Sequence, residues 1–520
     1  MGNETILTDR QTDRQTDRQT DRQTDRQTDR QTTDKRNGFK HWLIVLLFNV
    51  LALSPLLVFS HVHYSVDTYN VYYVGAAGHI RAFLGSYRYF GAFVYRIISS
   101  FGHNPIDNPF PDVIAFIVFT AIASSTLVVY IVSKFKNRKT ITFLVIDFSI
   151  LITVANVWFT DLLAFSECIS LTAVGLACCF FGIIVFAEKK NIWQYLLAII
   201  LFICATATYQ QLMSVFIIYT IAILCIKTVS AADKNFKNNL FSFFKDAALI
   251  FVGAVLYYVI GVAIQKALRI PSNPRASLKV ETIFENIKYY IVHQHSFLKG
   301  RGYFNSEILT VCYLLMALLF AISLIVYIIK TKDFKKSAFI GVSFVIAYIS
   351  AYIPGLVSTS HATRTMFALF SVFALLAIGS IVLSKNMTIY KIVVCILVLV
   401  FALNIYKTVD VSVNQVVQNN KEITFAESVA YAIEKYENET GSVVDSIGIS
   451  YDENADAGSE TFYTDYAVES LLTLYCGNEM QFVETPENVF NMCFVDKNWT
   501  LLDTNEQIVF VDNIAYVCVY

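Results

Sequence analysis

Charged residues are scarce in this sequence, and their scarcity excludes an ordinary soluble globule. Asp, Glu, Lys and Arg supply 16% of the 520 residues, whereas soluble domains carry about a quarter. Hydrophobic residues reach 55%, and the mean hydropathy is +0.52. No soluble segment holds a basic patch with interleaved aromatic residues, so no nucleic-acid partner is predicted. The composition predicts a polytopic α-helical membrane protein.

Long apolar runs divide the chain. Runs of the length that crosses a hydrocarbon core of about 30 Å can be placed about eleven times, and the fifth and sixth are short enough to be tilted or tightly paired. The predicted spans are Trp42–Ser60, Asp112–Ser133, Ile141–Phe159, Cys168–Ala187, Ile192–Thr206, Leu212–Ile226, Ala247–Ala267, Ile308–Ile329, Ala338–Ile353, Met366–Leu383 and Ile392–Thr408.

Basic residues collect after every second span. By the positive-inside rule these turns are cytoplasmic, which puts the N-terminus inside and the chain after the last span outside. The loops that hold Asp67 and Lys299 then also lie outside. The basic residues concerned are Lys134, Lys136, Arg138, Lys139, Lys189, Lys190, Lys227, Lys234, Lys237, Lys245, Lys330, Lys332, Lys335, Lys336, Lys385 and Lys391.

A low-complexity tract fills most of the predicted cytoplasmic tail, residues 1–40. Asp9-Arg10-Gln11-Thr12 is repeated six times up to Thr32, and without apolar residues the tract cannot fold alone. The bases GACA, repeated and read in triplets, encode this order of residues. The tract is therefore similar to the slippage-prone repeats of bacterial genes for surface polysaccharide modification, which predicts phase variation. A plain disordered tail, or a start codon assigned too far upstream, is the alternative.

The composition changes again after the last span. Residues 410–520 are predicted to form a small extracytoplasmic α/β domain that follows a transmembrane domain of residues 41–409. Helical periodicity covers Phe425–Tyr436 and Tyr463–Tyr475, and Asp512-Asn513 is expected to form a two-residue hairpin turn. Three cysteines here allow one disulfide but make no framework. They are Cys476, Cys493 and Cys518, and the predicted strands are Val443–Ser450, Gln481–Glu484, Met492–Val495, Gln507–Val511 and Ala515–Val519.

Asp67 is the first candidate for chemistry. It lies seven residues beyond the first span, in the polar loop that continues to Asp112. A carboxylate at the outer membrane surface can act as a general base; a solvated loop acid or a helix N-cap is the alternative. Arg88, in the Gly85-Ser-Tyr-Arg88 element of the same loop, can pair with phosphate, although snorkelling to the interface explains an isolated arginine equally well.

Polar groups of three kinds lie in further outer segments. Asp161 and Glu167, in the turn between the third and fourth spans, can line a site or bind an acceptor sugar through its hydroxyls. Tyr209 and Gln210 lie in a short hairpin at bilayer depth, where polarity is costly and usually functional. The third group is cationic and consists of Lys299, Arg301 and Arg364.

Histidine offers little for a metal. His61, His63, His293 and His295 have no acidic cluster of ligand spacing beside them, and a His-x-His pair is a weak signal. We therefore expect neither a metal nor another cofactor.

The chain from Trp42 to Ile405 resembles the O-antigen glucosyltransferase family, bacterial membrane enzymes of the GT-C superfamily. The resemblance rests on the order and placement of short motifs: Ser65-Val-Asp67-Thr-Tyr69, Gly85 to Arg88, Asn156 to Glu167, and Tyr209-Gln210. It implies a multi-pass protein of the bacterial inner membrane that moves glucose from an undecaprenyl-phosphate carrier to a surface polysaccharide. A donor synthase and a flippase are implied partners. Other members often have paired acids after span one, whereas Asp67 stands alone here.

The implied reaction needs one base and a cationic clamp. Asp67 takes the proton of the acceptor hydroxyl, which attacks the anomeric carbon with inversion. Arg88, Lys299, Arg301 and Arg364 are the candidates that hold the carrier phosphate, and Asp161, Glu167, Tyr209 and Gln210 are the candidates that bind sugar or acceptor.

Two alternative functions remain. A flippase for lipid-linked saccharides needs ionisable groups near mid-membrane and related halves, but the polar residues gather at the outer surface and no repeat among the spans is evident. An O-antigen polymerase or ligase shares the lipid substrate, but it usually places its large external loop late in the chain. The acid in the first loop favours the transferase.

Overall fold

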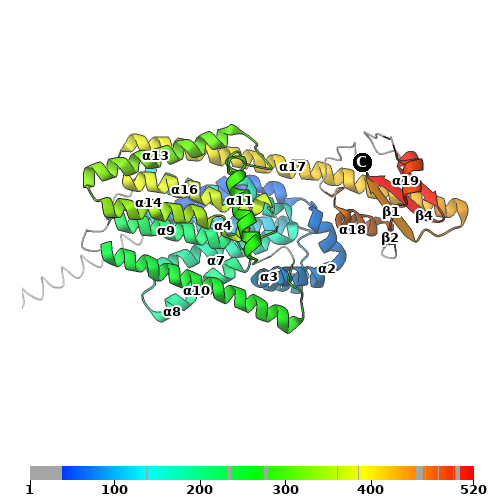
Figure 1. The fold of residues 1–520 in the computed structure, drawn as a ribbon, viewed down its shortest axis with the longest axis horizontal. Coiled ribbons are helices and arrows are strands. Elements are labelled where there is room, and N and C mark those ends of the chain that lie inside the picture. Colours follow the sequence, from blue (N-terminus) through cyan, green and yellow to red (C-terminus); the bar gives the residue numbers. More distant parts are fainter. Residues whose placement is uncertain are drawn as a thin grey trace, which may run out of the picture.

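The computed structural model describes residues 38–135, 139–230, 236–273, 279–359, 361–384, 386–451, 461–462, 464–477, 480–495, 497 and 504–519, with only the backbone at 237–239 and 504. The predicted phase-variable tract and the basic residues Lys136, Arg138, Lys234 and Lys385 lie outside the described residues. Helices dominate the described chain, and a small sheet follows them near the C-terminus (Figure 1).

Nine helices of the described chain are long and apolar enough to cross a membrane, which is compatible with a polytopic membrane protein. Each of the nine contains one of the predicted spans. The other two predicted spans are also helices, but α8 (Ile192–Thr206) has 15 residues and α14 (Phe334–Ser350) has 17. The nine segments are Gly38–Ser60, Phe110–Ser133, Thr140–Ala164, Ser166–Glu188, Gln211–Ser230, Leu240–Leu268, Glu307–Thr331, Thr363–Leu383 and Met387–Thr440.

Packing follows the apolar pattern of these helices. The most deeply buried segment is Thr363–Leu383, which contains α16 (Ala368–Leu383): 89% of its most apolar stretch is buried. In α10 (Phe236–Leu268) and α13 (Glu307–Thr331) only 11% and 22% of the corresponding stretch is buried. Aromatic rings such as Trp158, Phe159 and Phe367 fill the centre. Exposed apolar side chains on α10 and α13 form the outer surface of the bundle, as expected for helices that face lipid.

The two ends of the bundle differ in charge. Helix α7 (Ile169–Glu188) has 20 residues, a length of about 30 Å at 1.5 Å per residue. At its C-terminal end Lys134 pairs with Glu188, Lys189 pairs with Asp246 at 2.7 Å, and Lys227 donates to the carbonyl of Ala187 at 2.7 Å. Its N-terminal end follows Glu167. The lysines predicted to be cytoplasmic therefore gather about one membrane thickness from the acids of the candidate site.

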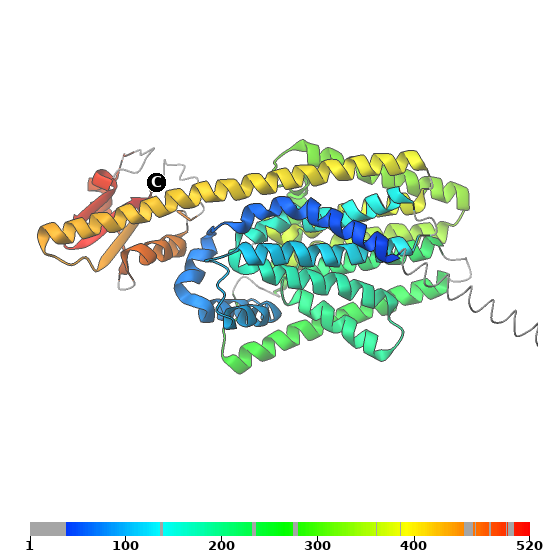
Figure 2. The ribbon, with the colours of Figure 1, turned by 180° about the vertical axis from the view of Figure 1, so that it is seen from behind.

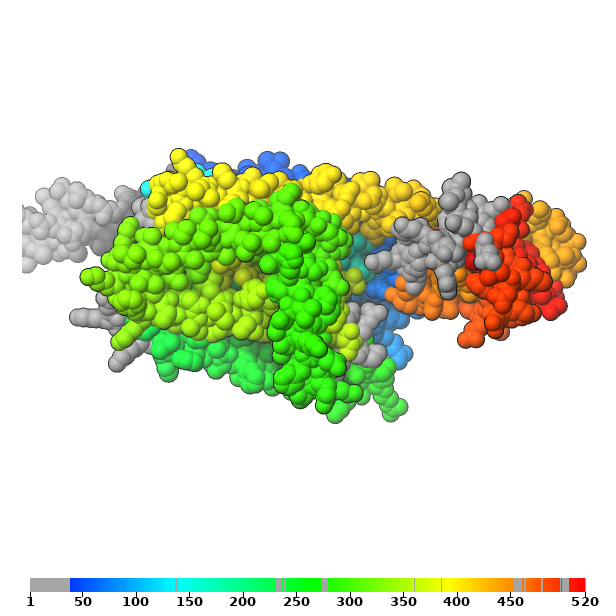
Figure 3. Space-filling view, turned by 45° about the horizontal axis from the view of Figure 1, so that its top comes forward, coloured from blue at the N-terminus to red at the C-terminus, as the bar shows by residue number. Residues whose placement is uncertain are grey.

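Three helices lie across the bundle or at its end. Helices α2 (Val66–Gly85) and α3 (Tyr89–Ser100) lie toward the same end of the bundle as the sheet. Helix α11 (Val280–Val292) runs crosswise to α13 in Figure 1 and forms a band over the bundle in Figure 3. Its Asn286 is buried and bonds the carbonyl of Leu356 at 2.9 Å, while Phe284 and Ile291 are exposed. Such a two-faced helix suits a membrane interface.

Helix α17 (Met387–Thr440) joins the bundle to the sheet. Its 54 residues form one helix along most of the molecule (Figure 2), about 80 Å long at 1.5 Å per residue. The predicted domain boundary between residues 409 and 410 falls inside this helix, which continues across it. A hydrocarbon core of about 30 Å cannot contain it, so more than half of α17 extends beyond such a core, and its C-terminal part reaches the sheet (Figure 2).

The C-terminal sheet has four strands in the order β2-β1-β4-β3: β1 (Ser446–Tyr451), β2 (Gln481–Glu484), β3 (Ile508–Val511) and β4 (Ile514–Val519). β1 pairs in parallel with β2 and β4, and β3 pairs antiparallel with β4. The predicted turn is confirmed, because Asp512 and Asn513 have φ of 52° and 64°, as a two-residue type I′ hairpin turn requires.

One predicted strand is wrong. Met492–Val495 is not extended, because α19 (Glu487–Cys493) contains its first two residues. Pro486 and Glu487 at the start of this helix are typical helix-start residues that outweigh the β propensity of the segment. Helix α18 (Asp465–Cys476) follows the predicted periodicity. All ten cysteines lie in the described part of the chain, and no disulfide joins them.

Candidate functional site

The first turn of α2 carries Asp67. Ser65 is the N-cap of this helix, and its Oγ accepts a hydrogen bond from the amide of Thr68 at 3.2 Å, as serine does at many helix starts. The capping role that the sequence left open for Asp67 therefore belongs to Ser65. Asp67 is half-buried in the first turn, where the helix dipole favours a negative charge.

A second carboxylate lies beside this turn. Thr68 Oγ1 donates to Glu167 Oε2 at 3.1 Å, and Asp67 is close enough to repel Glu167 electrostatically. Glu167 is only 2% exposed. Asp67 is alone within its own loop, but folding supplies a neighbouring acid from the turn before α7, 99 positions beyond Thr68.

The C-terminal region reaches Asp67. Tyr466, on α18, donates its hydroxyl proton to Asp67 Oδ1 at 2.6 Å. No described residue donates a hydrogen bond to the other oxygen, Oδ2. The tyrosine therefore fixes one oxygen of the carboxylate and leaves the second available to a ligand.

The projecting part of α17 holds the same loop. Tyr69 donates to Glu422 Oε2 at 2.6 Å, and Asn419 bonds both the amide and the carbonyl of Tyr64, at 2.8 and 2.9 Å. Burial, reinforced by Glu422, raises the pKa of the Tyr69 phenol, so the phenol stays protonated and donates. The start of α2 is thus fixed from the bundle by Glu167 and from the C-terminal region by α17 and α18.

A tight turn positions Arg88. Tyr87 has a φ of 60°, which is uncommon outside glycine, and the turn is held from two sides. Gln265 Nε2 donates to the carbonyl of Gly85 at 3.0 Å, and Gln210 Nε2 donates to the carbonyl of Ser86 at 2.8 Å. Gln210, predicted to bind sugar or acceptor, therefore supports the turn that carries Arg88.

Two arginines contact Tyr209, Arg88 through its guanidinium and Arg364 through its backbone. The carbon at the centre of the Arg88 guanidinium lies 4.9 Å from the ring centre of Tyr209, whose hydroxyl donates to the carbonyl of Arg364 at 3.3 Å. Arg88 Nε is buried, and no described residue bonds it. Arg364 lies 3.6 Å from Asp161 and stacks on Phe165 at 4.7 Å. Asp161 thus neutralises part of the charge of Arg364, whereas Arg88 has no carboxylate partner among the described residues.

The remaining two candidate cations, Lys299 and Arg301, lie in the loop between α12 (Gln294–Leu298) and α13. Arg301 donates to the hydroxyl of Tyr289, and its backbone carbonyl accepts from Trp158 Nε1 at 3.1 Å. Its loop approaches the Arg364 segment, because a Cβ placed on Gly302 would lie 3.3 Å from the Thr363 side chain. Lys299 forms an ion pair with Glu307 at 2.6 Å, and no contact in the described structure joins it to the other candidates.

Five candidate residues converge. Asp67, Glu167, Arg88 and Arg364 all lie within electrostatic range of Cys168, and Tyr209 lies between the two arginines. Asp161 joins them through Arg364, Gln210 supports the Arg88 turn, and Arg301 borders the group. The arrangement offers an open carboxylate oxygen within electrostatic range of the two positive groups.

The histidines have structural partners. His63 is buried between the carbonyls of His61 and Leu163, at 2.7 and 3.0 Å, and burial lowers its pKa. His293 stacks on Tyr289, and His295 faces Glu307. The described residues contain no group of three or more His, Cys, Asp or Glu side chains able to hold a metal ion.

Residues 56–383 match the family described as Glucosyl transferase GtrII, which is more than half of the chain. The chain belongs to this glucosyltransferase family. The family resemblance seen in the sequence is thereby confirmed, and it is consistent with an O-antigen glucosyltransferase of the GT-C type. A comparison with curated proteins finds no match.

The matched segment of this glucosyltransferase contains every predicted site residue, from Asp67 to Arg364, and ends at Leu383. Helix α17 and the sheet lie beyond it. Tyr466, Glu422 and Asn419 therefore reach the site from outside the matched segment. Sequence reasoning missed all three, because only tertiary contact joins them to the first loop. The Ser65 cap was readable in principle, as a serine immediately before a periodic helical segment.

Proposed function

We propose that this glucosyltransferase moves glucose from a polyprenyl-phosphate carrier to a surface polysaccharide such as O-antigen, on the non-cytoplasmic face of the bacterial inner membrane. One observation carries the proposal: Asp67 Oδ2 is open while Oδ1 is held by Tyr466, and Asp67 lies within electrostatic range of Arg364, which contacts Tyr209 beside Arg88. The open carboxylate oxygen suits an acceptor hydroxyl, and the two arginines suit a phosphate.

The reaction follows from this arrangement. The acceptor oxygen attacks the anomeric carbon of glucose while Asp67 Oδ2 takes the hydroxyl proton, acting as a general base. The bond between the anomeric carbon and the phosphate oxygen breaks, and its electron pair leaves with the carrier phosphate. Attack opposite the leaving group inverts the anomeric configuration. The leaving phosphate is already an anion, so positive charge is needed there rather than a proton donor.

Arg88 is the strongest candidate to contact the phosphate. Its Nε is buried without a partner among the described residues, and a guanidinium offers a planar set of donors that matches phosphate oxygens. Arg364 supplies the second charge. Lys299 is the weakest candidate, because Glu307 already neutralises it.

The orientation is part of the proposal. The lysines near Glu188 gather at the opposite end of α7 from Glu167, and by the positive-inside rule that end faces the cytoplasm. The site and the sheet would then lie outside, where the surface polysaccharide is found. Outward transfer needs a donor synthase and a flippase as partners.

The test is glucose transfer by the purified protein in nanodiscs, with undecaprenyl-phosphate-glucose as donor and polysaccharide from a strain that lacks the gene as acceptor. Asp67→Asn keeps the shape of the side chain but removes the base, and we expect a loss of about a hundredfold or more. Asp410→Asn on α17 serves as the control and should keep full activity, because Asp410 pairs with Lys407 on the same helix and contacts none of the described site residues. No transfer by the unmodified protein, or more than a tenth of normal activity in Asp67→Asn, would refute the assignment.

A further inference from the structure

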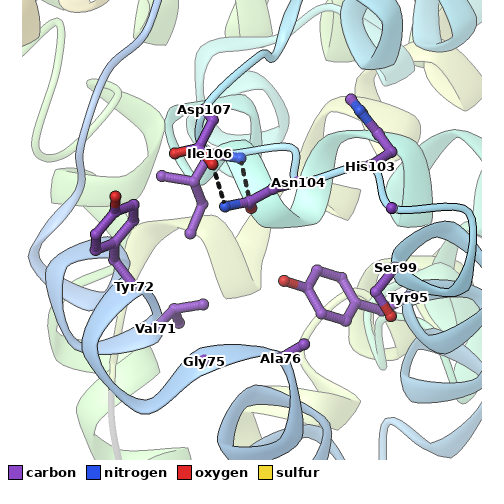
Figure 4. Close-up of a pocket in the computed structure, with 11 residues that line it drawn as sticks. Val71, Tyr72, Gly75, Ala76, Tyr95, Ser99, His103, Asn104, Ile106 and Asp107 are labelled. Atoms are coloured by element: carbon purple, nitrogen blue, oxygen red, sulfur yellow. Dashed lines mark hydrogen bonds between the residues drawn. The ribbon is translucent and has the colours of Figure 1, made fainter.

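A cavity of about 330 Å³ lies between α2, α3 and the loop that leads to α4 (Phe110–Ser133) (Figure 4). Its size is at the lower end of the range of about 300–1,000 Å³ for small-molecule sites. Tyr72, Tyr95, Asn104 and Asp107 supply most of its chemistry. None of these residues was singled out by the sequence, and none belongs to the group around Tyr209.

A break in α2 shapes one wall. Gly75 has a φ of 68° and a ψ of −178° inside the helix, and no atom lies within 4 Å of the position that a Cβ would take. Only glycine adopts this conformation readily. The helix therefore bends at Gly75, and Val71 and Ala76 on either side of the bend both line the cavity.

The opposite wall presents a fixed carboxylate. Asn104 Nδ2 donates to Asp107 Oδ2 at 2.7 Å, and Asn104 Oδ1 accepts from the amide of Ile106 at 3.2 Å. These bonds hold the amide and carboxylate side by side, as the dashed lines in Figure 4 show. No described residue donates to Asp107 Oδ1, which leaves that oxygen to accept hydrogen bonds from a ligand.

Tyr95 contributes a donor. Its hydroxyl points into the cavity (Figure 4) and makes no hydrogen bond to a described residue, although the whole side chain is only 3% exposed. Burial and then the nearby Glu167 raise its pKa to about 12, so the phenol keeps its proton. Tyr72, 44% exposed, adds an aromatic surface at the rim.

This combination fits a neutral sugar better than a phosphate. The described residues that line the cavity include no lysine or arginine, and the lining His103 is paired with Asp112 at 2.6 Å, so an anion would meet the Asp107 carboxylate without a free compensating charge. A pyranose instead offers several hydroxyls, which can donate to a carboxylate and accept from a phenol, and an apolar C–H face, which packs on aromatic rings.

We propose that the cavity binds one hexopyranose unit of the acceptor polysaccharide and thereby selects which sugar is glucosylated. The assignment to the acceptor rests on the proposed function and on position. Val71 follows Asp67 by four residues, so the two lie on the same side of α2, about one turn apart. A sugar in the cavity can therefore belong to the chain whose neighbouring hydroxyl meets the general base.

The variants Tyr95→Phe and Asp107→Ala test this proposal, with the nearby exposed Asn108→Ala as control. Transfer is measured in nanodiscs against increasing concentrations of polysaccharide from the gene-deletion strain, at saturating undecaprenyl-phosphate-glucose, and then with the two substrates exchanged. Each test variant removes a hydrogen-bonding group, and we expect the KM for the polysaccharide to rise about tenfold. The kcat and the KM for the donor should stay within twofold of normal, and Asn108→Ala should change nothing.

Binding without turnover separates the cavity from the chemistry. The Asp67→Asn protein should bind the same polysaccharide in calorimetry, and adding Asp107→Ala should weaken that binding about tenfold, even if glucose proves to be the wrong donor sugar. Equal binding with and without Asp107→Ala would overturn the proposal. A rise in the KM for the donor instead would assign the cavity to the sugar of the donor. A fall in kcat alone would assign Asp107 a structural role. Either result would also overturn the proposal.

Discussion

The contact between Tyr466 and Asp67 makes the C-terminal region part of the proposed active site, and removing one oxygen tests this. Tyr466→Phe keeps the ring and deletes the hydroxyl that donates to Asp67 Oδ1 at 2.6 Å. A hydrogen bond to a charged group contributes about 1.5–3 kcal/mol. Because Asp67 is half-buried and Tyr466 is 37% exposed, the lower value applies, and about 1.4 kcal/mol corresponds to a tenfold change in rate. We therefore expect kcat to fall about tenfold.

The assay is the same nanodisc transfer reaction, with kcat and both KM values measured. Tyr431→Phe is the matched control, since Tyr431 belongs to α17 and is 67% exposed; its activity should equal that of the unmodified protein. Abundance and melting temperature should not differ between the two variants, because neither change opens a cavity in a core.

A double-mutant cycle decides whether Tyr466 acts through Asp67. If it does, Tyr466→Phe should have no further effect once Asp67 has been replaced by Asn, because the partner charge is already gone. Full activity of Tyr466→Phe would refute the reasoning. An additional tenfold loss in the Asp67→Asn background would also contradict it, since the tyrosine would then act independently of the carboxylate.

Much of the helical framework could be predicted, because a membrane-spanning helix appears in the sequence as one uninterrupted apolar run. Every predicted span corresponds to a helix, and α8 begins and ends at the predicted residues. The helix bounds could not be predicted at α17, where the apolar run ends near Thr408 but the helix continues to Thr440. The polar half of that helix is stabilised by contacts such as Asn419 to Tyr64, which no local pattern reveals.

The candidate site was only partly predictable, for the same reason. Their residue types and their predicted position on the outer side of the membrane indicated Asp67, Arg88 and Arg364 one by one. The sequence pattern does not show which of these side chains lie close together in the fold. Tyr466 lies 399 positions after Asp67, in a region expected to be a separate soluble domain. Glu167 looked like an acid on a turn and is buried, because the turn folds against the start of α2. Long-range contacts of this kind require the fold.

Three further predictions extend to the cations, to pH and to the repeat. Arg364→Lys keeps the charge but loses the planar stack on Phe165, so transfer should fall about tenfold while the exposed Arg96→Lys remains fully active in the same assay. Burial and Arg88 lower the pKa of His79 to about 3, below the value of about 6.5 in an unfolded chain. The folded state then resists protonation of His79, so the free energy of unfolding is at its full value above pH 6.5 and falls by about 1.4 kcal/mol per pH unit below it. The melting temperature of His79→Gln should therefore drop less between pH 7 and pH 5 than that of the unmodified protein. An equal drop in both proteins would contradict the assignment. The Asp-Arg-Gln-Thr tract is encoded, in our interpretation, by a four-base repeat, and four is not a multiple of three. Gain or loss of one base unit therefore shifts the reading frame ahead of every span, three units restore it, and full-length proteins from sibling isolates should differ by whole Asp-Arg-Gln-Thr blocks. In-frame deletion of all six blocks should leave glucose transfer unchanged, because a tract without apolar residues adds nothing to the fold; codons that do not spell GACA, or a serious loss of transfer on deletion, would refute the phase-variation hypothesis.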